Sequence, residues 1–180
     1  GAAPVQSPGP TGEGLREIVD ARCSLQREME GNHALNDGLD AYAARCLLMG
    51  MAQYTIDVQY YIWHNDMSGR LLFSALLDAA ERGVKVRLLL DDNNTPGLDD
   101  TLAELDRHPN IAVKLFNPFS FRTLRALGYL TDFARLNRRM HNKSLTVDDA
   151  ATLVGGRNIG DEYFGTGDEP LFTDLDVLAL

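Results

Sequence analysis

The sequence has no long apolar run. None of its 180 residues falls in a stretch that approaches the roughly 20 apolar residues of a membrane-spanning helix. The opening residues "GAAPVQSPGPTGEG" also lack the basic and apolar regions of a secretory signal peptide. We therefore expect a chain that is soluble as given, with a flexible N-terminal tail and lead-in over residues 1–34.

Cysteine is scarce as well. Cys23 and Cys46 are the two cysteines of the chain, and neither belongs to a C-x-x-C pair or to another metal-ligand spacing. We expect reduced, structural cysteines, and a disulfide between them is the alternative. A zinc-protease spacing such as H-E-x-x-H is also missing, so no metal or other cofactor is predicted.

Basic residues are too few for a general nucleic-acid binder. The chain has 17 basic and 26 acidic residues and a formal net charge of −9, whereas nonspecific nucleic-acid affinity comes largely from Lys and Arg on phosphates. Between residues 122 and 143, however, six basic residues stand against one acidic residue. Such an island predicts a local anionic ligand, and a solvated helix face with ion-paired arginines is the alternative.

The hydrophobic pattern alternates between helical and strand periods along the middle of the chain. The expected elements are helices at 37–52, 68–83 and 98–106 and strands at 54–63, 84–92 and 111–116. In the first helix the apolar positions at helical spacing are Leu39, Tyr42, Ala43, Cys46, Leu47 and Met51. This alternation predicts one α/β domain over residues 35–180, with a mixed, largely parallel sheet sandwiched between helices.

A basic, aromatic segment follows the last of these strands. After a turn at Asn117-Pro118, the pattern predicts a helix from about Phe121 to Arg135 in which apolar groups alternate with arginines. An amphipathic helix of this composition could touch a membrane interface, or it could pack on its own core. Both alternatives stay open.

The order H-x-K-x-x-x-x-D sets three chemically active residues close together. His141 and Lys143 fall in a predicted strand over residues 141–147, and Asp148 begins the turn that follows. Because side chains alternate along a strand, His141 and Lys143 share one face and Asp148 points the other way. We therefore expect the first two to work as a pair and Asp148 to brace the strand or a neighbouring loop.

A second short strand runs into Gly155 and Gly156, where the backbone can approach a ligand closely, and Asn158 can turn its amide toward the same pocket. An imidazole, an ammonium and an amide suit a phosphodiester. A neutral histidine can attack phosphorus while Lys143 and Asn158 hold the non-bridging oxygens. Fixed cationic donors then take the role that a metal ion has in other phosphoryl-transfer sites.

The histidine also needs a carboxylate that fixes its tautomer. Asp174 and Asp176 begin the apolar strand "FTDLDVLAL" on one face; Asp174 is the first choice, and acids at the solvated mouth of a strand are the alternative. Asp91 and Asp92 end a strand where α/β proteins often bind ligands, but a polar turn also explains them. The isolated histidines, interpreted as surface or satisfied residues, are His33, His64 and His108.

These residues resemble the signature of the phospholipase D superfamily, which is H-x-K-x-x-x-x-D followed by G-[SG]-x-N. Longer segments are similar to the N-terminal half of bacterial cardiolipin synthases of the C type. They include "VQYYIWHNDMSGRLLFSALLDAAERGVKVRLLLDDNNTPGLDD", "LGYLTDFARLNRRMHNKS" and "TLVGGRNIGDEYFG". The resemblance covers about residues 35–180 and implies a phosphatidyltransferase that acts on phospholipids through a phosphohistidine, without metal.

By position, the resemblance implies that His141 is a catalytic histidine and that Lys143, Asn158 and Gly156 bind the substrate phosphate. Asp148 is then the third member of the catalytic motif, and Asp174 matches the acid that contacts the histidine. The implied reaction uses phosphatidylglycerol and phosphatidylethanolamine and gives cardiolipin and ethanolamine at the bacterial inner membrane. The basic segment would serve as an approach surface for anionic lipid.

The superfamily site needs two such motifs, whereas this chain carries one and stops inside an apparent strand. We therefore expect a fragment that supplies one half-site and is inactive alone, bound peripherally to the membrane or anchored by a segment absent from this sequence. Its partner would be the second half of the same protein or a homodimer mate. Two alternatives stay open: a single-motif phosphodiesterase or nuclease active as a homodimer, and a non-catalytic lipid-binding half.

Overall fold

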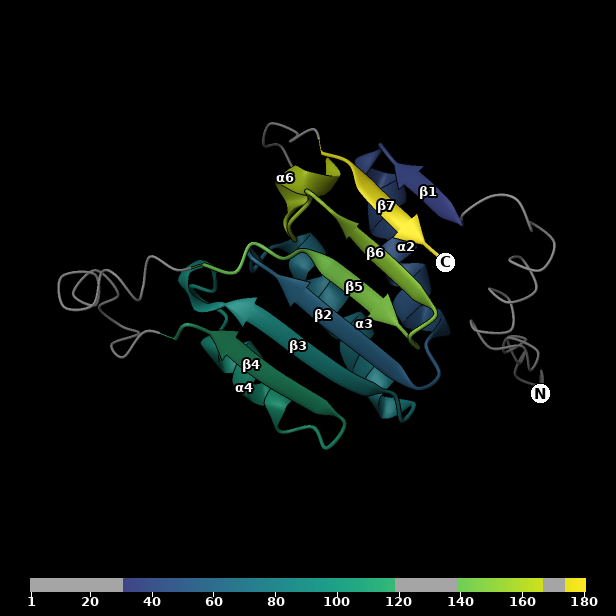
Figure 1. The fold of residues 1–180 in the computed structure, drawn as a ribbon. Helices are drawn as coiled ribbons and strands as arrows, with labels where there is room; N and C mark the ends of the chain where they lie inside the picture. The colour runs from purple at the N-terminus through teal and green to yellow at the C-terminus, as the bar shows by residue number, and fades with distance from the viewer. Residues whose placement is uncertain (1–30, 119–138, 167–173) are drawn as a thin grey trace, which may run out of the picture.

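One mixed β-sheet organises the computed structural model, which describes residues 31–118, 139–166 and 174–180. In this part of the chain the strand order is β1-β7-β6-β5-β2-β3-β4 (Figure 1). The strands are β1 (Asn32–Leu35), β2 (Thr55–Tyr60), β3 (Lys85–Asp91), β4 (Ile111–Phe116), β5 (Ser144–Val147), β6 (Ala151–Gly155) and β7 (Asp176–Ala179). The helices are α2 (Gly38–Met51), α3 (Met67–Glu81), α4 (Asp99–Asp106) and α6 (Asp161–Phe164), with a 3-10 turn, η1 (Asp92–Asn94).

The predicted helices and strands of the first half are confirmed. The side chain of Asp37 caps α2 by accepting from the backbone N–H groups of Leu39 and Asp40, and Asp66 caps α3 through Gly69. The sheet begins before the expected domain boundary at residue 35, because residues 32–35 form β1 and pair with β7. The helix expected at 121–135 lies outside the described residues.

The sheet combines a parallel half and an antiparallel half. β2, β3 and β4 run parallel and are connected through α3 and α4, whereas β5, β6, β7 and β1 pair in antiparallel fashion. The α/β class and the mixed sheet are confirmed, but a largely parallel sheet is wrong: two of the six strand pairings in the described residues are parallel. A physical reason is the tight turn at residues 148–150 between β5 and β6, which is too short for a parallel crossover.

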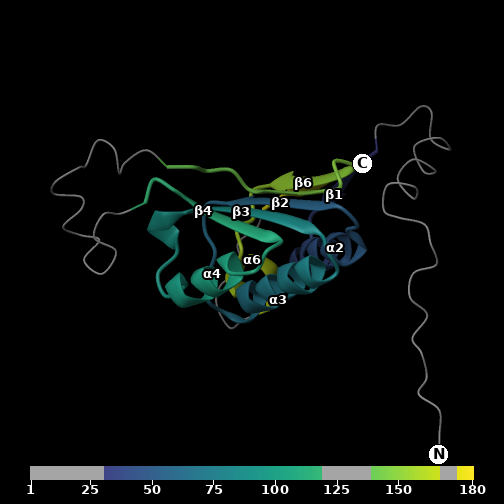
Figure 2. The same cartoon turned by 90° about the horizontal axis from the view of Figure 1, so that it is seen from below.

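The four described helices lie on one face of the sheet (Figure 2). The expected sandwich is therefore wrong for the part of the chain that the structure describes. Strand β2 shows why, since Ile56, Val58 and Tyr60 are buried beneath the helices while the residues between them turn to the other side. Such an alternation of apolar and polar residues is typical of a strand with one face uncovered.

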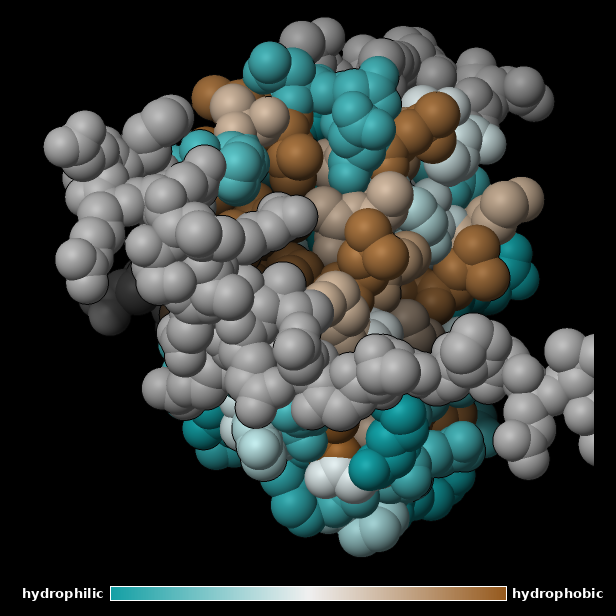
Figure 3. All heavy atoms as spheres, turned by 90° about the vertical axis from the view of Figure 1, so that its right-hand side faces the viewer, coloured by the Kyte–Doolittle hydropathy of each residue, from teal (hydrophilic) through white to brown (hydrophobic). Residues whose placement is uncertain are grey.

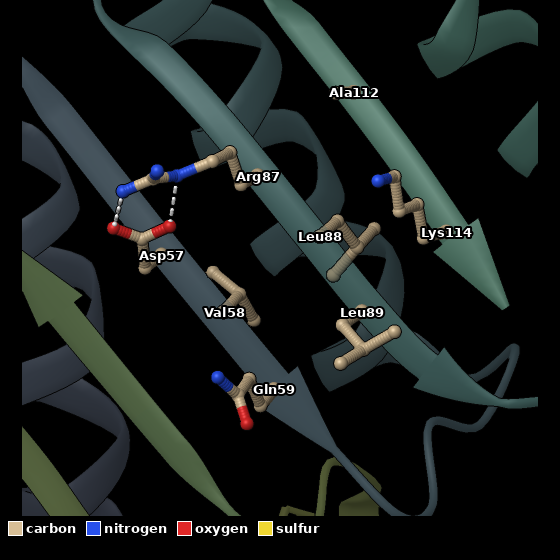
Figure 4. A pocket seen from close by; sticks show the side chains of 8 residues that line it. All are labelled: Asp57, Val58, Gln59, Arg87, Leu88, Leu89, Ala112 and Lys114. Atoms are coloured by element: carbon tan, nitrogen blue, oxygen red, sulfur yellow. Dashed lines mark hydrogen bonds and ion pairs between the residues drawn. The ribbon is translucent and has the colours of Figure 1, made fainter. Parts of the chain in front are cut away.

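The uncovered face is polar and slightly hollowed. Figure 4 shows Asp57 of β2 pointing toward Arg87 of β3, and the two side chains form an ion pair with two hydrogen bonds. Gln59 and Lys114 stand on the same face, beside a hollow of about 460 Å³. The ion pair is exposed, so it contributes little to stability.

Helix α2 buries only part of its apolar stripe, since Tyr42, Cys46 and Met51 pack against the core. Leu39 and Leu47 are 57% and 64% exposed, whereas the buried residues of the helix include Ala41, Arg45 and Leu48. Figure 3 views the molecule from the side of α2, β1 and the C-terminus and shows apolar side chains gathered there. The apolar period located the helix correctly, but an arginine occupies the centre of its buried face.

Arg45 is buried because it joins a network of charges behind the sheet. Its guanidinium donates to Asp176 Oδ2 at 2.9 Å, to the Tyr60 hydroxyl at 3.0 Å and to the Ala41 carbonyl at 2.7 Å. Asp176 is completely buried on β7 and also pairs with Arg157 at 3.5 Å. The network ties α2 to both β2 and β7, so these elements are held in one arrangement.

Candidate active site

His141 and Lys143 lie immediately before β5, beside the end of β2. The strand predicted over 141–147 is confirmed only from Ser144, so strand parity does not govern the two residues. They still lie together, because Lys143 Nζ donates to the carbonyl oxygen of His141 at 3.0 Å. His141 is exposed and Lys143 is half-buried, so the imidazole is open to a ligand.

Tyr61 supports the histidine. It follows the last residue of β2, and its ring stacks on the His141 imidazole with a centroid distance of 4.0 Å and an interplanar angle of 22°. The Lys143 ammonium lies 5.7 Å from the same tyrosine ring, in cation–π range. Tyr61 is not among the residues predicted for the site, since it is the pairing of β2 with β5 that brings the two segments together.

Asn158 is buried and its amide is already oriented. Its Oδ1 accepts from the backbone N–H of Ile62 at 3.0 Å, directly after Tyr61 in the chain. The Tyr163 hydroxyl is hydrogen-bonded to the same amide. Burial raises the pKa of Tyr163 and the carboxylates of Glu162 and Asp174 add to this, while the bond to Asn158 acts in the opposite direction. Asn158 and Tyr163 thus stand next to the segment that carries Tyr61.

Gly156 is required by a close approach of Asp174. A Cβ atom at Gly156 would lie 2.2 Å from Asp174 Oδ1, and the backbone N–H of Gly156 donates to the Leu175 carbonyl at 3.1 Å. The space left by the glycine is therefore occupied by the carboxylate that was expected to orient the histidine. In the described residues, no hydrogen bond joins Asp174 to His141, so that role stays a prediction.

Asp148 lies at the opposite end of β5 from His141. Its carboxylate is buried and accepts from the backbone N–H groups of Gln53, Tyr54 and Thr55 at 2.9, 2.7 and 2.8 Å. These bonds hold the loop between α2 and β2, which is the bracing role expected for Asp148. Its grouping with the catalytic residues rests on the motif alone.

The positive island is described only in part. Arg139 and Lys143 are its described members, and Arg139 forms an ion pair with Asp91 at 3.2 Å. Ion pairing, the alternative to ligand binding, therefore applies to Arg139. The other basic residues of the island lie outside the described residues.

A second polar cluster contains a histidine but is satisfied without a metal. Ligand atoms of His64, Asp66 and Glu162 all lie within 4.8 Å of one another. His64 pairs with Glu162 at 3.0 Å, while the Asp66 oxygens accept from the backbone N–H groups of Gly69 and Asp161. These bonds agree with the interpretation of His64 as a satisfied surface residue.

The described residues include one cysteine, Cys46. Cys46 is a free thiol, and burial raises its pKa, so the thiolate is not favoured there. Cys23 lies outside the described residues. No helix in the described ranges has the length and apolar character needed to cross a bilayer.

The fold and the site together define a phospholipase D-like α/β domain: a mixed sheet that carries a histidine and lysine before one strand and an oriented asparagine after the next. A sequence model of the family described as cardiolipin synthase, PLD-like domain, matches residues 46–175. The chain belongs to this family.

A relative with a curated name is similar over most of the chain. Cardiolipin synthase C from Escherichia coli is 71% identical over 166 residues, which is 92% of this chain and 35% of the relative. Cardiolipin synthase B from the same organism is 32% identical over 147 residues, 81% of this chain and 33% of the relative. This chain therefore spans about a third of the length of these relatives.

Solved structures share the fold at low sequence identity. NucT from Helicobacter pylori superposes with a TM-score of 0.59 at 18% identity, over 82% of this chain and 83% of that chain. Nuc from Salmonella typhimurium, a phospholipase D family member, has a TM-score of 0.52 at 18% identity, over 82% of each chain. These likenesses support the fold class.

Proposed function

We propose that this chain supplies one of the two half-sites of a cardiolipin synthase, a phosphatidyltransferase of the phospholipase D superfamily. The observation that carries the proposal is the 71% identity with Cardiolipin synthase C over 92% of the chain. The geometry supports it, because His141 is exposed, stacked on Tyr61 and next to the Lys143 ammonium. The substrates and partner of the whole protein belong to the proposal.

The proposed chemistry proceeds in two displacements at phosphorus. One motif histidine attacks phosphatidylethanolamine, forming a P–N bond as the P–O bond to ethanolamine breaks, and the other histidine protonates the departing oxygen. A glycerol hydroxyl of phosphatidylglycerol then attacks the phosphohistidine and transfers its proton to the second histidine. Cardiolipin and ethanolamine result, and both histidines return to their starting state. His141 fills one of these two roles.

Lys143 and Asn158 would bind the non-bridging oxygens of the phosphodiester. The ammonium brings a charge, and the buried amide is pre-oriented by its bond from Ile62, so it needs little reorganisation. Asp174 lies against Gly156 and near Tyr163, and its carboxylate would accept from the imidazole N–H of the catalytic histidine. The second half-site would come from the rest of the same protein, at the membrane surface that holds the lipids.

A chimaera tests the proposal. This chain would replace its matching 166 residues in Cardiolipin synthase C, and the chimaera would be produced in cells without their own cardiolipin synthases. We expect cardiolipin in the lipid extract, and its loss on His141→Ala. His108→Ala is the matched control, because that histidine lies in a different part of the fold and bonds only locally with Asn110. Cardiolipin made by the His141→Ala chimaera would refute the catalytic assignment.

A second candidate is a single-motif phosphodiesterase or nuclease that completes its site by homodimerisation. It is considered because the 180 residues carry the H-x-K-x-x-x-x-D motif once and share a fold with NucT. The net charge of −9 speaks against a nucleic-acid substrate. A chain that sediments as a monomer and leaves DNA and a chromogenic phosphodiester uncleaved would exclude this candidate.

A non-catalytic lipid-binding half is the third alternative. In that case the chimaera would make no cardiolipin, while the chain would still bind vesicles of phosphatidylglycerol. Vesicle flotation of the chain, compared with its Lys143→Ala variant, measures this binding directly.

A further inference from the structure

A buried carboxylate on another strand holds the segment that leads into His141. Asp91 is the last residue of β3 and has no exposed surface. Its Oδ2 accepts from the backbone N–H of Met140 at 3.0 Å, and its Oδ1 accepts from Arg139 Nη1 at 3.2 Å. Because Met140 directly precedes His141, this carboxylate fixes the backbone next to the histidine.

Residues at the ends of β2 and β3 therefore both contact the short segment that contains Met140 and His141. β2 lies between β3 and β5 in the sheet, so Asp91 reaches past the end of β2, where Tyr61 follows. Tyr61 contacts the imidazole ring, and Asp91 holds the backbone just before it. The ring and the backbone of this segment are thus held from different strands.

The hydrogen bonds of Asp91 are buried, and one of them joins two charged groups, so they are costly to break. Both its partners and the carboxylate are largely buried, with Arg139 9% and Met140 8% exposed. Hydrogen bonds between charged groups are stronger than neutral ones, and a buried charge that loses its partner is costly. The segment before His141 is therefore fixed more firmly than its place outside a strand suggests.

We propose that Asp91 is a positioning residue for His141. Its carboxylate holds the backbone of residues 139–140 so that the imidazole stays stacked on Tyr61 in one orientation. The inference rests on the proposed function in one respect: a fixed orientation matters because a nucleophile or acid must meet phosphorus or oxygen in a narrow geometry.

The neighbouring residue offers a matched comparison. Asp92 is also completely buried, but its carboxylate accepts from the Thr95 hydroxyl at 3.1 Å, three residues further along the chain. Asp91→Asn and Asp92→Asn therefore remove the same charge at adjacent buried positions. The first change weakens the described contacts with residues 139–140.

Nuclear magnetic resonance of the 180-residue chain tests the proposal without any activity assay. The ring protons of His141 are identified by their loss in His141→Ala, and Tyr61→Leu gives their shifts without the stacked ring. We expect Asp91→Asn to move these chemical shifts toward the Tyr61→Leu values. It should also weaken the nuclear Overhauser signal between the ring protons of Tyr61 and His141. Asp92→Asn should leave both unchanged. A folded Asp91→Asn chain with unaltered His141 signals would overturn the proposal.

Arg139→Gln keeps the test decisive if Asp91→Asn does not fold. It removes the guanidinium partner and leaves the carboxylate, and it should shift the His141 signals in the same direction; no shift in this variant would count against the proposal. In the chimaera, Asp91→Asn should lower kcat by about 10- to 100-fold with little change in KM, as for other supporting residues of a site. If the proposed function fails, every chimaera is inactive, while the resonance shifts still report on positioning.

Discussion

At the residue scale, the motif divides between the two ends of one strand. His141 and Lys143 stand before β5 and face the ring of Tyr61, whereas Asp148 stands after it and accepts from three consecutive backbone N–H groups. These N–H groups belong to the loop that opens β2, and β2 ends next to Tyr61. Asp148 thus supports the site through the strand that presents the tyrosine.

We expect Asp148→Ala to destabilise the chain by about 2–4 kcal/mol, because it leaves three backbone donors without their acceptor. Asp149→Ala is the control, since both residues have positive φ, 54° and 51°, and both alanines carry the same backbone strain. Asp149 is exposed, so its change should cost only that strain. Urea unfolding measures both variants, and equal losses of stability would contradict the bracing role.

At the scale of elements, a buried charge network fixes α2 on the sheet. Burial by itself would lower the pKa of Arg45, but the Tyr60 hydroxyl and the Asp176 carboxylate outweigh it and raise the pKa above its ordinary value. The arginine therefore stays charged, and the Asp176 carboxylate on β7 supplies the opposite charge. Since the network joins α2, β2 and β7, its loss affects the antiparallel half of the sheet as a unit.

Asp176→Asn should lower the free energy of unfolding by about 3–5 kcal/mol, because it leaves Arg45 and Arg157 buried without a carboxylate. Asp57→Asn is the control on the open face, where the ion pair with Arg87 is exposed and should contribute little. Thermal unfolding followed by circular dichroism compares the two. A loss at residue 176 no larger than that at residue 57 would show that the network is energetically unimportant.

Sequence periodicity located α2, α3, α4 and the strands β2, β3 and β4, because each has local caps or a clear apolar period. It misjudged part of the buried face of α2, since Arg45 reads as polar unless its partner Asp176, 131 residues away, is known. The contact between Tyr61 and His141 depends in the same way on the pairing of β2 with β5. The motif therefore identifies the chemistry, while the residues that orient it depend on strand pairing.

At the scale of the whole molecule, one sheet with a helical layer on one face presents His141 at the start of its central strand β5. The other face carries the exposed pair Asp57–Arg87 and remains open in the described residues. Under the proposed function, this half-site would take a second histidine from outside the described residues. The chain spans about a third of the length of its named relatives. Stability and activity are then separable, because the core does not depend on His141.

Alkaline pH should unfold the molecule through the buried Tyr60 and the partly buried Tyr42. Burial raises the pKa of Tyr60, although Arg45 beside it acts in the opposite direction, and the pKa of Tyr42 is raised to about 12. The folded chain keeps these protons while the unfolded chain releases them, so the stabilisation is complete below about pH 10 and is lost as the pH rises further. Each such tyrosine lowers the free energy of unfolding by about 1.4 kcal/mol per pH unit in that range.

Tyr60→Phe isolates the contribution of the most buried of these groups. The variant keeps the ring that packs edge-on against Trp63 at 5.7 Å but has no hydroxyl to titrate. It loses the bond from Arg45 and is less stable at neutral pH, yet its stability should fall less steeply as the pH rises above about 10, the ordinary pKa of tyrosine. Urea unfolding at several pH values gives both slopes. Identical slopes would mean that Tyr60 already ionises in the folded chain, and that its hydroxyl is not sealed from water by α2 and the sheet.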